Sequence, residues 1–134
     1  MVQIKKIEHK GVLLAKLISG EWEQGLSFYS EPNDFIQAGS WRYAKGKELL
    51  PHVHNAVERK IDRTQEVLFV KKGRVRVKIF DLEDKPLAEH ELRAGDIGIF
   101  LRGGHGYTVL EDDTQVLEVK NGPYPGPDAD RRRL

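Results

Sequence analysis

The chain has 134 residues, 22 basic and 21 acidic side chains, a formal net charge of +1 and no cysteine. This length fits one domain, and 39% hydrophobic with 32% charged residues is typical of a globular chain rather than a disordered one. The near-balance of charge argues against a nucleic-acid-binding protein and against a polybasic membrane-surface protein. The lack of cysteine excludes disulfides and thiolate sites and fits a reducing compartment. With no signal-peptide pattern and no apolar run near the ~20 residues that span a bilayer, we expect a cytoplasmic protein.

Short apolar runs separated by turn-forming residues recur along the chain. In residues 74–79, valines and an isoleucine alternate with arginine and lysine, so the apolar side chains share one face of a strand and the cations share the other, solvated face. Many short strands with regular turns are typical of a β-sandwich or barrel. The sequence therefore predicts an all-β domain with strands over residues 4–7, 12–18, 26–29, 41–43, 67–70, 75–80, 97–101, 107–110 and 116–119.

Two further segments have other patterns. Residues 55–63 (NAVERKIDR) carry the best helical signal, with Asn55 as a possible N-cap, and they predict a turn of helix or an ordered loop. Residues 121–134 contain three of the six prolines and end in three arginines and a leucine. We expect this tail to pack partly through Tyr124 and then to fray.

Histidine and glutamate mark the candidate site. His52 and His54 flank one valine, so in an extended segment both imidazoles lie on the same face and can reach one ion. Glu66 opens an apolar strand that ends at Gly73. Further on, a second strand and a pair of glycines lead into His105.

This ordered combination resembles the two sequence motifs of the cupin superfamily, over residues 46–107. The first motif, G(x)5HxH(x)3-4E(x)6G, is matched by Gly46, His52, His54, Glu66 and Gly73, and most of the second, G(x)5PxGxxH(x)3N, by Gly95, Gly103 and His105. The chain departs from the second motif at Leu101, in place of proline, and at Val109, in place of asparagine.

The resemblance implies one double-stranded β-helix (a cupin, or jelly-roll, barrel) over residues 1–134, with its core at about 40–120 and a partly ordered tail at 121–134. It also implies one divalent transition metal, iron, manganese, nickel, cobalt or zinc, held by His52, His54, Glu66 and His105. Eleven residues separate His54 from Glu66, more than the motif allows, and Glu58 lies at the shorter spacing. We prefer Glu66 because an apolar strand and a glycine follow it, and Glu58 stays a rival ligand.

Aromatic and cationic residues near the motifs are pocket candidates. Trp41 and Tyr43 share a face just before the first motif, and Tyr107 shares a face with His105 if that strand continues. Tyr43 and Tyr107 are candidate catalytic residues, and all three aromatics equally suit a core.

Trp41, Arg59 and Arg63 are the candidate substrate-binding residues. An arginine can clamp a carboxylate or phosphate, although both arginines also fit a solvated surface. His9 and His90 lie among charged neighbours, and we expect both at the surface.

The predicted function is that of a metal-dependent enzyme acting on a small polar substrate, sugar-like or a carboxylate, as an isomerase or epimerase or as an Fe(II) dioxygenase. The main alternative is a non-catalytic module that binds a small ligand. A third possibility is a metal-independent epimerase with a histidine base and a tyrosine acid, for which Tyr43 or Tyr107 would serve. The resemblance further implies a carbohydrate-related role and a homodimer. From the balance of charge, we expect no nucleic-acid or membrane partner.

Overall fold

The computed structural model describes all residues 1–134 and contains ten strands and one short helix. Strands make up 45% of the chain and the helix 3%, so the prediction of an all-β protein is confirmed. The elements are β1 (Gln3–His9), β2 (Val12–Ser19), β3 (Gly25–Phe28), β4 (Gly39–Arg42), β5 (Glu66–Lys72), β6 (Arg74–Phe80), β7 (Pro86–Arg93), β8 (Ile97–Phe100), β9 (His105–Val109), β10 (Gln115–Lys120) and α1 (Pro127–Asp130).

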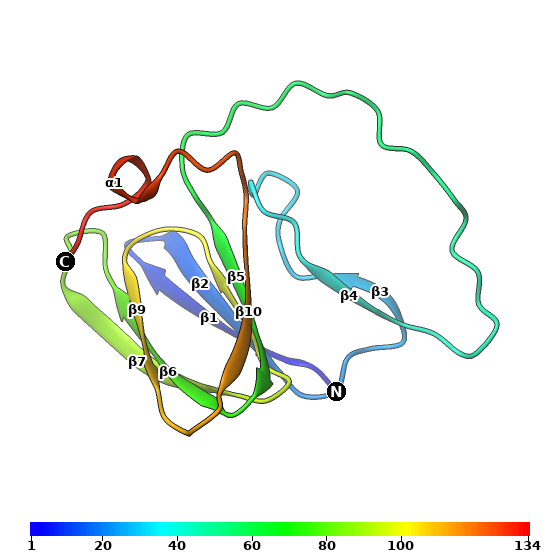
Figure 1. The fold of residues 1–134 in the computed structure, drawn as a ribbon, viewed down its shortest axis with the longest axis horizontal. Coiled ribbons are helices and arrows are strands. Elements are labelled where there is room, and N and C mark those ends of the chain that lie inside the picture. The colour runs from blue at the N-terminus through cyan, green and yellow to red at the C-terminus, as the bar shows by residue number, and fades with distance from the viewer.

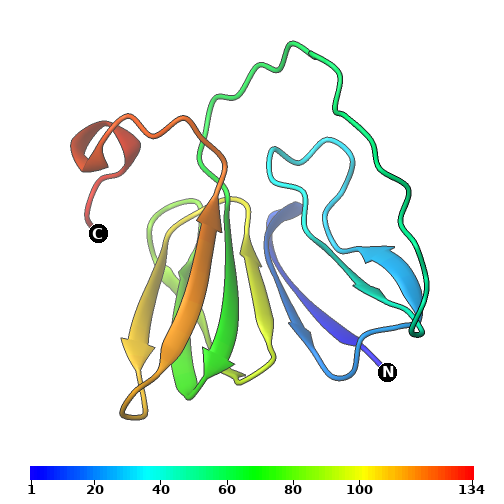
Figure 2. The same cartoon turned by 45° about the vertical axis from the view of Figure 1, so that its right-hand side comes forward.

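The strands form three antiparallel sheets. A five-stranded sheet has the order β1-β2-β8-β5-β10, a three-stranded sheet has the order β7-β6-β9, and β3 pairs with β4. The two larger sheets face one another, with the β3–β4 pair to one side (Figures 1 and 2). They are not joined into a closed barrel, because β9 and β10 are edge strands that do not pair with each other.

The main core lies between the two larger sheets. On β6, Val75, Val77 and Ile79 are almost completely buried and alternate with more exposed residues, as the sequence pattern predicts. They pack in one cluster with Leu14 of β2 and Leu68 of β5, which belong to the facing sheet. Burial of these apolar side chains is the dominant force that holds the sheets together.

A second core covers the other face of the five-stranded sheet. Ile18, Ile97 and Ile99 pack there against Tyr29 and Ile36, which lie in or beside the connection between β3 and β4. The Tyr29 hydroxyl hydrogen-bonds to the Ser40 hydroxyl. Tyr29 is therefore a residue of this second core.

The register of the edge strands directs their polar side chains into the interior. His105 pairs with Ile79 and Tyr107 pairs with Val77, and cross-strand partners share one face of a sheet. His105 and Tyr107 therefore lie on the inner face, as expected for two residues on one strand. In the facing sheet, Glu118 of β10 pairs with Leu68, and it also points inward.

Residues 43–65 form a long connection between β4 and β5 without helix or strand. Figures 1 and 2 show it as an arch that stands away from the sheets, and residues 44–64 are exposed throughout. Of the two predictions for residues 55–63, a turn of helix or an ordered loop, the structure shows a loop: no helical hydrogen bonds form, and a segment this short gains too little from propensity alone to be helical without packing.

Two further features of the structure differ from the predictions made from the sequence. The sequence pattern does not predict β7, because its sequence PLAEHELR lacks the apolar alternation of the other strands; it is an edge strand on which only Leu92 is fully buried. In the tail, Tyr124 is largely exposed, and the chain instead forms α1 and returns to the sheets, where Arg132 pairs with Asp84. No helix of the protein is long and apolar enough to cross a membrane.

Candidate functional site

The candidate site is centred on Glu66 and His105, at the open side of the sandwich. Glu66 is the first residue of β5 and His105 the first residue of β9, and the His105 Nε2 lies 2.6 Å from the Glu66 Oε2. The Glu66 side chain is 5% exposed, whereas that of His105 is 30% exposed. A ligand can therefore reach the imidazole more readily than the carboxylate behind it.

Hydrogen bonds keep Glu66 ionised despite its burial. Burial by itself disfavours the charged form, but hydrogen bonds from His105, Glu118 and Tyr107 outweigh it and lower the pKa of Glu66 to about 2. An ionised carboxylate has no proton to give, so the His105 Nε2 must carry the hydrogen in this contact. In neutral His105, the Nδ1 is then the basic nitrogen.

Tyr107 supports the same carboxylate. Its hydroxyl donates a hydrogen bond to the Glu66 Oε2 at 3.0 Å. Burial and the adjacent Glu66 charge raise the pKa of Tyr107 well above its ordinary value, so the phenol stays neutral and remains a donor. The structure thus places Tyr107, a predicted catalytic candidate, beside Glu66 as a residue that holds it.

Glu118 of β10 is a second carboxyl group in the site. Its hydrogen bond to Glu66, together with burial, raises the pKa of Glu118 above the ordinary value. Two carboxyl groups in contact share one proton more readily than they bear two charges, and here the proton stays on the more exposed partner. Lys120 lies 3.9 Å from Glu118 and offsets part of the negative charge.

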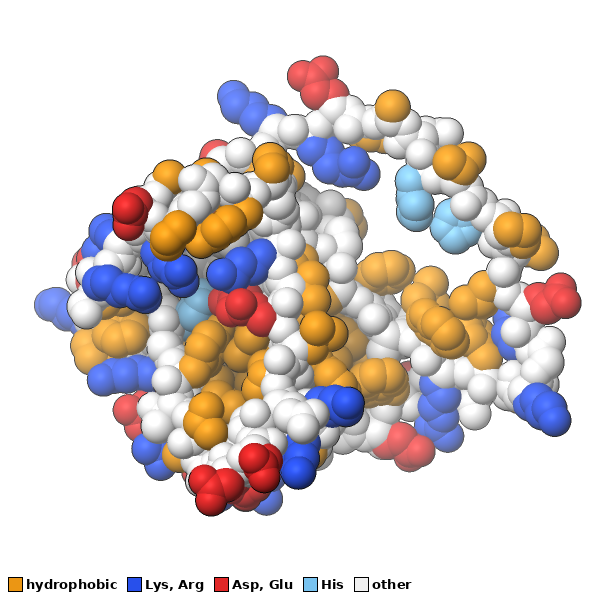
Figure 3. All heavy atoms as spheres, in the orientation of Figure 1, with side chains coloured by type: hydrophobic (Ala, Val, Ile, Leu, Met, Phe, Trp, Pro, Cys, Tyr) orange, Lys and Arg blue, Asp and Glu red, His pale blue; other side chains and the backbone are white.

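A cavity of about 800 Å³ opens beside these residues. Figure 3 shows Lys and Arg side chains gathered around a hollow on this side of the molecule, with acidic side chains among them. Its wall comes from the ends of β6 and β9, the inner face of β10 and the C-terminal tail. The charged and polar lining residues include Thr64, Glu66, Asp81, Asp84, Arg102, His105, Tyr107, Glu118, Lys120, Asp130, Arg131, Arg132 and Arg133.

The structure divides the four predicted metal ligands into two pairs. Glu66 and His105 are in direct contact, and the His52 and His54 rings lie 5.0 Å apart on the exposed arch. No three of the four bring their ligand atoms within 4.8 Å of one another.

This arrangement does not fit a metal centre on the predicted residues. A transition-metal site requires its donors to surround one point, each about 2 Å from the ion. The Glu66 Oε2 already accepts hydrogen bonds from His105 and Tyr107. The four-ligand metal site remains a prediction from the sequence.

The other predicted site residues lie outside the cavity wall. Trp41 is exposed on β4 with its ring 6.0 Å from that of Tyr43, and Arg59 and Glu58 are exposed on the arch. Arg63 stacks on the Phe35 ring at 5.2 Å. None of these residues is brought to Glu66 and His105.

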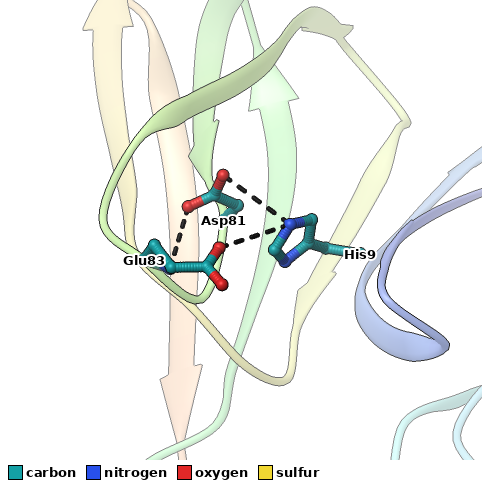
Figure 4. Close-up of side chains that lie close together, drawn as sticks. All are labelled: His9, Asp81 and Glu83. Atoms are coloured by element: carbon teal, nitrogen blue, oxygen red, sulfur yellow. Dashed lines mark hydrogen bonds and ion pairs between the residues drawn. The ribbon is translucent and has the colours of Figure 1, made fainter.

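A separate cluster joins the end of β1 to the turn between β6 and β7. The His9 Nε2 lies 3.4 Å from a Glu83 oxygen and 3.8 Å from an Asp81 oxygen (Figure 4). The Leu82 amide points at the His9 Nδ1 at 3.5 Å, which leaves the hydrogen on Nε2. The His9 Nε2 therefore donates its hydrogen to the carboxylates, and it has no free lone pair with which to bind a metal ion beside them. Its side chain is 17% exposed, so the surface position expected for His9 is only partly correct.

Sequence reasoning missed the wall of the cavity. Glu118 lies in a strand that the sequence predicts at residues 116–119, but nothing in the sequence indicates that its side chain points inward or that β10 faces β9 across an open edge. The arginines of the tail stand out in the sequence only as a charged end, because their return to the sheets depends on single long-range contacts.

Comparison with models of known protein families, with curated proteins and with solved structures gave no match. The fold and the geometry of the site therefore carry the functional argument alone.

Proposed function

We propose that this protein is a small acid–base enzyme of the isomerase or epimerase type, in which His105 moves a proton on a small polar substrate. The observation that carries this proposal is the 2.6 Å contact between the His105 Nε2 and the Glu66 Oε2 at the wall of a cavity. A buried carboxylate that fixes the tautomer and orientation of a more exposed histidine is a recurring way to build a general base.

The proposed step uses the His105 Nδ1, the ring nitrogen that does not contact Glu66. The His105 Nδ1 takes a proton from a carbon next to a substrate carbonyl, and the electron pair of the broken C–H bond moves into that carbonyl. Return of a proton to the opposite face of the same carbon gives an epimer. If that carbon bears a hydroxyl group, transfer of the hydroxyl proton to the former carbonyl oxygen and protonation of the former carbonyl carbon give an isomer, with the new carbonyl where the hydroxyl was. Glu118 is suited to return the proton, because its carboxyl group is half exposed and its pKa is raised.

Tyr107 has a different role in this scheme from the tyrosine acid of a metal-independent epimerase. Its hydroxyl is committed to Glu66 and its pKa is raised, so it is a poor proton donor to substrate. We assign it as a residue that positions the carboxylate.

For the fold, we propose a double-stranded β-helix of the cupin type that is open between β9 and β10. Two facing antiparallel sheets with a shared core support this assignment, as do the glycine turns at Gly73 and Gly95. The homodimer and the cytoplasmic location rest on the sequence alone and stay part of the proposal.

A metal-dependent enzyme is the second candidate. It is supported by one observation: His52 and His54 lie side by side on the connection that runs directly into Glu66. A different course of this connection would be needed to bring them to Glu66 and His105.

Hydrogen exchange from solvent tests the proposed reaction even while the product is unidentified. The protein is incubated in D₂O with a panel of aldoses, ketoses, sugar phosphates and 2-hydroxy acids, with and without chelator, and deuterium at carbon is followed by NMR. We expect incorporation that His105→Ala abolishes and that His90→Ala, a matched histidine on β7 outside the cavity, leaves intact. Exchange that survives His105→Ala contradicts the proposed base, and exchange lost on chelation and in His52→Ala favours the metal-dependent candidate. No exchange with any compound leaves a non-catalytic binding module.

A further inference from the structure

The carboxylates in the cavity wall are already engaged. Each accepts a hydrogen bond or shares a proton within the protein. In chain order, Glu66 accepts hydrogen bonds from His105 and Tyr107, Asp81 from the Glu83 and Lys85 amides, Asp84 from Arg132, and Asp130 from the Thr64 hydroxyl. Glu118 shares a proton with Glu66.

Three arginines in the same wall have no such partner. The side chains of Arg102, Arg131 and Arg133 make no ion pair and no hydrogen bond. Arg102 lies between β8 and β9, three residues before His105, and the other two belong to the tail. These three guanidinium groups are therefore unpaired positive charges in the cavity wall.

The tail is anchored at three points, so its arginines are held near the cavity. Arg132 donates two hydrogen bonds to the Asp84 carboxylate, at 2.8 and 3.0 Å. Asp130 accepts the Thr64 hydroxyl, and Leu134 packs against Gly104, where its methyl group fills the place that a Cβ would take. Arg131 and Arg133 flank the anchored Arg132, and both line the cavity.

We infer that Arg102, Arg131 and Arg133 form a binding site for the anionic group of the substrate, a phosphate or a carboxylate, beside His105. Guanidinium groups bind such oxyanions through paired, charge-assisted hydrogen bonds. The inference deepens the proposed function and rests on it for the claim that the bound anion belongs to the substrate. The C-terminal tail is then part of the active site and not an appendage.

The test uses inorganic phosphate and acetate as probes, added separately to the full chain at low ionic strength. Binding is followed by two-dimensional NMR, with the amides of Gly103, Gly104 and Arg131 as reporters. We expect saturable shifts at these amides, and the probe that binds more tightly identifies whether the group is a phosphate or a carboxylate.

The variants separate site binding from general charge. Arg131→Gln/Arg133→Gln should weaken binding about tenfold or more, since two charge-assisted hydrogen bonds are lost. The control Lys72→Gln/Arg76→Gln removes the same charge from residues of β5 and β6 that do not line the cavity, and it should bind as the unmodified protein does. A third variant, Arg102→Gln, should weaken binding with the tail unchanged.

Shifts that are absent, or that weaken equally in the control, overturn the inference. The outcome is independent of the exchange experiment, because phosphate and acetate binding is read without turnover. If anion binding fails while exchange dependent on His105 persists, the arginine site is wrong and the proposed reaction stands. If binding is confirmed and no exchange occurs, the cavity is an anion-binding site without the proposed chemistry.

Discussion

Glu66 and His105 come from different sheets and meet at one end of the sandwich, where the carboxylate Oε2 lies 2.6 Å from the imidazole Nε2. The contact links the start of β5 to the start of β9 across the open side of the fold. It contributes to stability through a buried, hydrogen-bonded charge, and it directs the second imidazole nitrogen away from the carboxylate.

Replacement of Glu66 should change how stability depends on pH. The pKa of Glu66 is about 2 in the folded protein against an ordinary value of 4.5, so its contribution is present above pH 4.5 and is lost as pH falls toward 2. In Glu66→Gln, the free energy of unfolding should fall less between pH 4.5 and pH 2 than it does in the unmodified protein. At neutral pH, the variant should be less stable by about 2 kcal/mol. Urea denaturation at a series of pH values measures both effects. Parallel curves for the two proteins across the window would contradict the assigned role of Glu66.

Replacement of Glu118 should act with the opposite sign. The pKa of Glu118 is raised, so its stabilising contribution is present below its ordinary value of 4.5 and is lost as pH rises through the folded pKa. Glu118→Gln keeps a hydrogen-bond donor toward Glu66 at every pH. We expect the variant to be more stable than the unmodified protein at pH 8 by up to about 1 kcal/mol, with a smaller gain at high salt. Thermal unfolding at pH 4 and pH 8 checks this, and a less stable variant at pH 8 would show that the two carboxyl groups do not repel.

Two glycine turns allow a steric prediction with an internal control. Gly73 and Gly95 both have positive φ, 86° and 93°, but a Cβ at Gly73 would collide with Thr114, whereas at Gly95 it would meet nothing within 4 Å. Alanine at either position incurs the backbone penalty of about 1–2 kcal/mol. Gly73→Ala should lower the free energy of unfolding by a further amount of about 1–3 kcal/mol, because Thr114 and the β5–β10 pairing must shift. Chemical denaturation of both variants measures the difference, and equal losses would contradict the close approach of Thr114.

His52 and His54 should matter little for the stability of the metal-free protein. Both are exposed, and the only hydrogen bond from either ring is the local one between the His52 Nδ1 and the Leu50 carbonyl. The double variant His52→Ala/His54→Ala should change the free energy of unfolding by less than about 0.5 kcal/mol.

Addition of metal gives the reverse test of the sequence prediction. If iron, manganese, nickel, cobalt or zinc raises the melting temperature of the unmodified protein but not of this double variant, the predicted ligand set assembles and the arch takes another course. A large loss of stability in the double variant without metal would contradict the exposed position of both rings.

The sequence predicts nine of the strands because their apolar residues alternate or form short runs between turns. The resemblance to cupin motifs also predicts that Glu66 and His105 belong to one site, as ligands of one metal ion. The sequence does not predict β7, because an edge strand with one fully buried side chain can form without a regular alternation of apolar residues.

The parts that the sequence does not predict depend on contacts between distant residues. The Glu66–His105 bond, the proton shared with Glu118 and the docking of Arg132 on Asp84 each join residues at least 39 positions apart, as counted along the chain. Local patterns carry no information on such pairings. The course of residues 43–65 is equally undetermined by pattern, because the one local signal there, the short helical pattern at residues 55–63, is too weak to form a helix without packing.

The most direct measurement of the central claim is the tautomer of His105, by long-range ¹H–¹⁵N correlation NMR of the unmodified protein and of Glu66→Gln. We expect neutral His105 to carry its hydrogen on Nε2, with that proton shifted strongly downfield by the bond to Glu66, and we expect the shift to be lost in Glu66→Gln. A hydrogen on Nδ1, or an Nε2 proton that Glu66→Gln leaves unchanged, would contradict the orientation of the base and with it the proposed function.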